Sequence, residues 1–112
     1  MTLSPLIREI LQDGEDDWVA IDNVIAYAWR HAESSGTDPE AMTVELLTAL
    51  LKGNLMEIGT LEEAGFSPWC MPVADTVRTC VAAFDTYHWE PRGTLYWLSI
   101  TESGRSWLNE HP

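Results

Sequence analysis

Cysteine and histidine are the side chains in this sequence best suited to metal binding or nucleophilic chemistry, and the chain holds only two cysteines and three histidines. Cys70, Cys80 and His88 are separated by nine and then seven residues, which fits none of the compact spacings of zinc ligands. Cys80 and His88 are expected to pack on the inner face of a helix, because free cysteine commonly behaves as a small buried hydrophobe. We therefore expect no metal site and no cofactor.

An acid–base group is the next chemistry that the sequence could support. Asp85, His88 and Glu90 lie close together in the chain, but no serine or cysteine nucleophile is tied to them by the sequence. The glycine-containing stretches SSG at 34–36 and GTL at 59–61 match neither a P-loop nor a dinucleotide-binding fingerprint. The sequence therefore predicts a protein that is not an enzyme.

The balance of charge is the most informative bulk property. Eighteen acidic residues stand against six basic ones, which gives a formal net charge of -12 over 112 residues. Such a field repels nucleic-acid phosphates and anionic lipid, and it speeds encounter with basic proteins. We expect a basic protein partner, no direct binding to nucleic acid and no binding to membranes.

Length and cysteine content indicate the class of protein. A chain of 112 residues is expected to form a single domain over residues 1–112 with one core. The N-terminal MTLSPLIREILQDGEDD does not resemble a signal peptide, and no apolar run approaches the roughly 20 residues needed to span a bilayer. Two cysteines are too few for a disulfide framework, so we expect a cytoplasmic protein with reduced thiols.

Periodic apolar residues and capping residues predict five helices. Ser4, Asp22 and Asp38 are expected to cap the first three, and Gly53 suits the end of the third. The predicted helices run from Ser4 into QDGEDD at 12–17, from Asp22 to about Ala32, from Asp38 to Gly53, from Pro72 to His88, and from Thr101 over Trp107 and Leu108.

Three short segments are expected to be extended, namely WVAID at 18–22, LMEIGTL at 55–61 and LYWLSI at 95–100. The stretch EEAGFSPW at 62–69 is polar and contains glycine, which predicts a loop at the end of the second strand. The resulting order is helix, strand, helix, helix, strand and, after one more helix, a final strand. This is the order of a winged helix with a helix inserted between its two wing strands.

The segment SITESGRSWL at 99–108 resembles the last wing strand and following helix of the MarR-like regulators. That family's segment reads leucine-threonine, two residues, glycine and then a basic residue, and Thr101, Gly104 and Arg105 match it. The resemblance implies a mainly α fold with a small antiparallel β-sheet (α+β). It implies a winged-helix-like architecture in which a helix separates the two wing strands.

The whole chain also resembles a set of short, acidic, uncharacterised bacterial proteins. That resemblance implies a small stand-alone protein and no activity. The matching residues are DDWV at 16–19, then Gly65, Phe66 and Trp69, and finally Trp97, Leu98, Thr101 and Gly104.

DNA binding by a winged helix requires a basic third helix and a basic wing. The exposed face of the predicted third helix holds Glu40, Thr43, Glu45 and Thr48, with Lys52 at its far end. Residues 55–95 carry two arginines against six acidic residues. Because non-specific affinity rests largely on neutralising phosphates, the sequence argues against DNA binding by this chain.

Six tryptophans are many for a domain of this size. Trp18, Trp29 and Trp107 are expected in the core. Trp69, Trp89 and Trp97 flank the inserted segment, where an aromatic side chain is either a lid on the core or an anchor for a partner.

These observations predict a non-enzymatic, acidic protein-binding module. Two roles fit: an immunity protein or antitoxin that inhibits a basic toxin, and a nucleic-acid mimic. The alternatives are a winged-helix-like, transcription-associated protein that dimerises through its terminal helices, and a homodimer that shares the leucine-rich face of the third helix. The candidate binding residues are Asp13, Glu15, Asp16, Asp17, Glu62, Glu63, Trp69 and Trp89.

Overall fold

The computed structural model describes residues 3–92 and 95–111. Its mainly helical chain with a small antiparallel sheet confirms the predicted α+β class. None of the helices in these residues has both the length and the apolar character needed to cross a membrane. The elements are α1 (Ser4–Asp13), β1 (Val19–Ala20), α2 (Ile21–Ser35), α3 (Pro39–Lys52), β2 (Met56–Glu62), β3 (Gly65–Pro68), α4 (Val73–Thr86), β4 (Trp97–Ile100) and α5 (Glu102–Glu110).

Within the described residues, four strands form one sheet in the order β1-β4-β2-β3, and each neighbouring pair is antiparallel. Leu98 at the centre of β4 pairs with Val19 of β1 on one side and with Ile58 of β2 on the other. The two predicted strands separated by a helix are therefore direct neighbours. That helix, α4, lies between β2 and β4 in the sequence, as expected.

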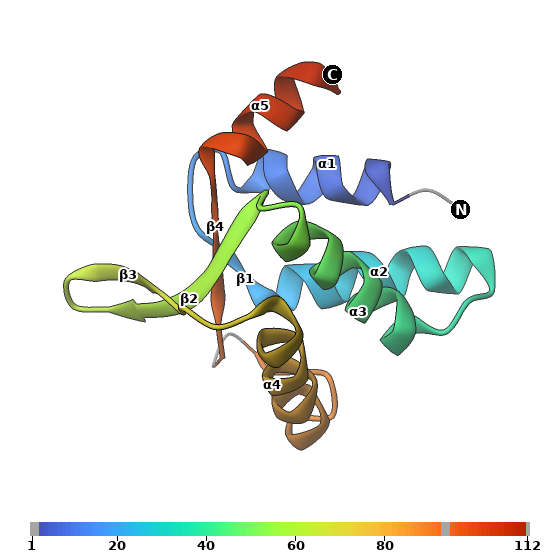
Figure 1. The fold of residues 1–112 in the computed structure, drawn as a ribbon. Coiled ribbons are helices and arrows are strands. Elements are labelled where there is room, and N and C mark those ends of the chain that lie inside the picture. Colours follow the sequence, from blue (N-terminus) through green and yellow to red (C-terminus); the bar gives the residue numbers. More distant parts are fainter. Residues whose placement is uncertain (1–2, 93–94, 112) are drawn as a thin grey trace.

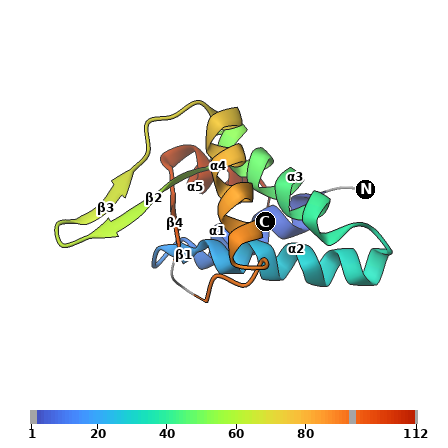
Figure 2. The same cartoon turned by 90° about the horizontal axis from the view of Figure 1, so that it is seen from below.

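The prediction of a loop at 62–69 is wrong, because Gly65–Pro68 forms strand β3 and pairs with β2 in a hairpin. Gly65 has a φ of +118°, a conformation that side chains rarely adopt, and this glycine lets the chain reverse after Glu62. In Figures 1 and 2 the hairpin projects away from the helices.

The core lies between one face of the sheet and the helices. Both views place α2, α3 and α4 to one side of the strands (Figures 1 and 2). The sheet contributes Val19, Ile58 and Leu98, and the helices contribute apolar stripes that were visible in the sequence. Fully buried helix residues include Ile10, Leu11, Val24, Ala28, Leu46, Leu47, Leu50, Cys80 and Phe84.

Thr101 joins α5 to the sheet and the end of α3. Its hydroxyl oxygen accepts a hydrogen bond from the Gly104 N–H at 2.9 Å, which confirms it as the helix cap. The same hydroxyl lies 2.6 Å from the carbonyl oxygen of Asn54, so one side chain fixes two segments far apart in the sequence. A Cβ on Gly104 would lie 2.2 Å from the carbonyl oxygen of Leu55, which explains why this position is glycine.

The cap of α3 is as predicted, since the Asp38 carboxylate accepts from the Ala41 N–H at 3.0 Å. Gly53 follows the last residue of α3 as predicted. The other two predicted caps are wrong by one or two residues. Leu3 precedes α1, so that Ser4 is already helical, and Ala20 precedes α2, which places Asp22 in its first turn. An acidic residue there still favours the positive end of the helix.

The end of α4 differs from the prediction, and His88 is exposed instead of lying on the inner face. The helix ends at Thr86, and His88 and Trp89 adopt φ values of +53° and +63°. This turn brings the Trp89 N–H to the carbonyl oxygen of Phe84 at 2.7 Å and places the Trp89 ring 5.1 Å from the Phe84 ring. Trp89 therefore fills the inner position expected for His88.

Two further predictions of exposure are wrong in opposite senses. Trp18 and Trp29, expected in the core, are 40% and 39% exposed. Thr43, expected on the open face of α3, is fully buried, and its hydroxyl donates to the carbonyl oxygen of Pro39 at 2.7 Å. Trp107 is half-buried against the core and stacks on His111.

Candidate protein-binding surface

The side chains considered for acid–base and nucleophilic chemistry lie in different surroundings. The Asp85 carboxylate accepts a hydrogen bond from the Trp89 indole at 2.9 Å, while His88 is exposed. Burial raises the pKa of the Cys80 thiol to about 12, which keeps it protonated and a poor nucleophile near neutral pH. Among the described residues, no three His, Cys, Asp or Glu side chains are grouped so as to hold a metal ion.

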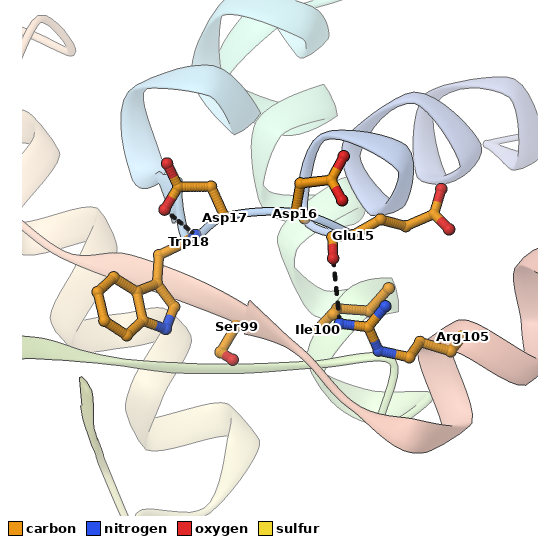
Figure 3. Close-up of a pocket in the computed structure, with 8 residues that line it drawn as sticks. Glu15, Asp16, Asp17, Trp18, Ser99, Ile100 and Arg105 are labelled. Carbon is orange, nitrogen blue, oxygen red and sulfur yellow. Dashed lines mark hydrogen bonds between the residues drawn. The ribbon is translucent and has the colours of Figure 1, made fainter. Parts of the chain in front are cut away.

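The connection between α1 and β1 carries three exposed carboxylates, those of Glu15, Asp16 and Asp17. Figure 3 shows them along this acidic loop, next to the Trp18 indole and one end of β4. Together with Ser99, Ile100 and Arg105, they line a hollow of about 330 Å³. The loop therefore presents its charges at the edge of the sheet.

Two hydrogen bonds hold the acidic loop in place. Arg105 of α5 donates from Nη2 to the carbonyl oxygen of Glu15 at 3.2 Å, a contact between residues 90 positions apart in the chain. The Asp17 carboxylate accepts from the Trp18 N–H at 2.8 Å. These contacts orient the loop and leave the carboxylates of Glu15 and Asp16 directed to solvent (Figure 3).

Asp13 belongs to a different contact. The Tyr27 hydroxyl donates to its carboxylate at 2.6 Å and so joins the end of α1 to α2. That hydrogen bond, with a smaller contribution from burial, raises the pKa of Tyr27 to about 12. The Arg30 guanidinium lies 5.3 Å from the centre of the Tyr27 ring. Asp13 thus has a structural role, separate from the other acidic residues of the predicted cluster.

Trp18 lies on the face of the sheet opposite to the helices. Leu98 and Ile100 of β4 pack against the core, as does Tyr96 just before the strand. Since side chains alternate along a strand, Trp97 and Ser99 lie on the opposite face. Glu57 pairs with Ser99 and shares this face. We call the set Trp18, Glu57, Phe66, Trp97 and Ser99 the open sheet face.

An aromatic pair connects the two edges of the sheet. The Trp18 ring, just before β1, stacks on the Phe66 ring of β3 with centroids 6.3 Å apart and planes inclined by 21°. Gly59 of β2 makes this possible, because a Cβ there would lie 2.9 Å from the tip of the Phe66 ring and 2.2 Å from the carbonyl oxygen of Ser67. Phe66 therefore lies across Gly59 and reaches toward Trp18.

Glu62 and Glu63, the other predicted acidic candidates, are exposed at the turn between β2 and β3. They stand at the tip of the projecting hairpin, on a different element from the acidic loop (Figure 1). The Trp18–Phe66 pair links the hairpin to the segment bearing the loop.

The predicted aromatic anchors are turned inward. Trp89 is only 7% exposed and packs on Phe84, the position of a lid on the core. Trp69 is half-buried, packs edge-on against Tyr96 at 4.4 Å and donates from its indole to the Thr60 hydroxyl at 3.2 Å. The exposed tryptophans are instead Trp18 and Trp29. The exposure of Trp18 could have been predicted from the sequence. Side chains alternate along extended backbone, so a buried Val19 places the side chain of Trp18 on the opposite face.

No family model, curated protein or solved structure matches this chain. The resemblance to MarR-like regulators and to short acidic bacterial proteins therefore stays a prediction.

Proposed function

We propose that this protein is a non-enzymatic acidic module that binds a basic protein. The observation that carries the proposal is an exposed tryptophan, Trp18, beside three exposed carboxylates at the edge of an open sheet face. Tryptophan is enriched among residues that dominate interface energies, and acidic residues steer a cationic partner toward the surface.

The mechanism has two steps that act over different distances. The net charge of -12 creates a field that attracts a cationic protein and raises its rate of encounter. Short-range contact with the aromatic pair then slows dissociation. An immunity protein that covers a cationic nuclease and a nucleic-acid mimic both need a partner surface that ordinarily holds phosphates.

A cytoplasmic location is part of the proposal. Cys70 and Cys80 are both free thiols, which suits a reducing compartment.

A transcription-associated, winged-helix-like protein is the second candidate. Two features of the topology favour this second candidate. In the sheet, β4 lies between β1 and β2, and in the sequence α2 and α3 separate β1 from β2. The chemistry of α3 does not favour it, because Glu40 and Glu45 are exposed there and Lys52 is its one cation. In addition, α4 packs against α3.

The test is to isolate complexes of the protein from its own cells at low ionic strength, and then to reconstitute them from purified components. We expect a stoichiometric complex with one strongly basic protein, measured by size-exclusion chromatography with light scattering, and weakening as salt is added. Self-association through α1 and α5 would instead give a dimer of the protein alone. Retention on heparin or duplex DNA with a steep salt dependence would overturn the proposal.

A further inference from the structure

In the part of the chain that the structure describes, the helices that pack on the other face of the sheet do not cover the open sheet face. In both views α2, α3 and α4 lie on the opposite side of the strands (Figures 1 and 2). Trp18 is 40% exposed and Phe66 and Trp97 are half-buried, and among the described residues none of the three belongs to the core cluster or packs against it. Aromatic surface of this kind, left open to water, is typical of a surface that a partner covers.

The border of this face is mainly acidic. Glu57 stands exposed on it, and Asp16 and Asp17 precede Trp18 at its edge. The nearby cation, Arg105, is turned to the Glu15 carbonyl oxygen. An aromatic centre with an acidic border recognises a cation in two ways, through the face of the indole ring and through the carboxylates.

We propose that the open sheet face is the docking surface for a cationic segment of a partner protein, with an arginine side chain of that segment stacked on the exposed face of Trp18. This inference rests on the proposed function and identifies the surface that serves it. Arginine is favoured over lysine because its planar guanidinium stacks on indole while still donating to carboxylates.

Charge complementarity separates this occupant from the others. A second copy of the chain would bring the same acidic border against itself, with a net charge of -12 on each copy. Nucleic acid and anionic lipid are repelled by the same groups. A cationic protein segment is the occupant that the aromatic centre and the acidic border both favour.

The first experiment titrates the protein with a synthetic peptide of alternating arginine and glycine while indole N–H signals are followed by NMR. The Trp18 signal is identified by its absence in Trp18→Phe. We expect the peptide to shift the Trp18 signal and to leave that of Trp29 unchanged. Trp29 is the matched control, because it is 39% exposed but lies on α2. Equal shifts of both signals would mean unspecific attraction and would overturn the assignment.

Variants give a second readout. Trp18→Ala should weaken peptide binding by about fivefold to tenfold, the size of a partly desolvated cation–π contact. Trp29→Ala should change it by less than about twofold. Because Trp18→Ala also removes a contact with Phe66, each variant is first checked by thermal unfolding. Glu57→Gln leaves the aromatic pair intact and should weaken binding by about twofold, whereas Glu33→Gln, exposed on α2, should not.

The natural partner distinguishes the two proposals. If a basic protein binds the wild-type chain and Trp18→Ala equally well, the docking surface is wrong and the proposed function stands. If no basic protein forms a complex with the wild-type chain, the proposed function is wrong. If Trp18→Ala no longer forms the natural complex and Trp29→Ala still does, the result supports both the proposed function and the docking surface.

Discussion

Among single residues, the contact between Tyr27 and Asp13 gives a direct test of the packing of α1 on α2. The pKa of Tyr27 is raised to about 12, so the stability due to this contact is complete below pH 10 and is lost as the pH rises through about 12. Asp13→Asn should return the Tyr27 pKa toward 10 and cost about 1 kcal/mol at neutral pH. Ultraviolet absorbance of tyrosinate during a pH titration measures the first effect, and urea unfolding the second.

The control for this titration is Tyr87→Phe, which removes an exposed tyrosine. The late step should persist in full in that variant and lose the contribution of Tyr27 in Tyr27→Phe. Tyr96, whose pKa is also raised, mainly by burial, contributes in both variants. An unchanged Tyr27 titration in Asp13→Asn would show that the hydrogen bond is not the cause.

The two cysteines should differ sharply in reactivity. Cys70 is exposed between β3 and α4, whereas Cys80 is fully buried, with its pKa raised to about 12 by burial. We expect one thiol equivalent to react rapidly with a disulfide reagent in the folded protein and the second to react only after unfolding. In Cys70→Ser the rapid phase should be absent. Two rapid equivalents in the wild type would contradict the buried position of Cys80.

At the level of elements, the Thr101 cap holds α5 to the turn after α3. Thr101→Val removes the hydroxyl that accepts from Gly104 and bonds to the Asn54 carbonyl oxygen, and should destabilise the protein by about 1–2 kcal/mol. Thr101→Ser keeps the hydroxyl and should recover most of that loss. Thermal unfolding measures both variants. Equal melting temperatures for valine and serine at this position would show that the cap contributes nothing.

How well the sequence predicted each element depended on how local its cause is. The cap at Asp38 and the apolar stripe of α3 are properties of adjacent turns, so they were predicted correctly. Strand β3 has only four residues, of which two are glycine and proline, and its pairing partner decides its conformation. His88 was misplaced because helical spacing was extended past Thr86, where left-handed backbone rotates the next side chains.

The same distinction applies to the candidate surface. The acidic loop could be predicted, because a run of charge in a connection is exposed wherever the connection lies. The Trp18–Phe66 pair could not, since it joins residues 48 positions apart through a hairpin that depends on the space at Gly59. The position of Trp18 therefore depends on tertiary packing, whereas the exposure of the acidic loop could be predicted from the sequence.

Over the whole molecule, long-range charge and short-range contact should separate in the kinetics of binding to a basic partner. Neutralising border charges with Asp16→Asn and Glu57→Gln should lower the association rate and flatten its dependence on salt, because these residues act through the field. Trp18→Ala leaves the net charge at -12, so it should leave association nearly unchanged and raise the dissociation rate about tenfold. Surface plasmon resonance at several salt concentrations measures both rates. The Trp29→Ala control should alter neither rate, and a Trp18→Ala effect confined to association would contradict its role as the anchor.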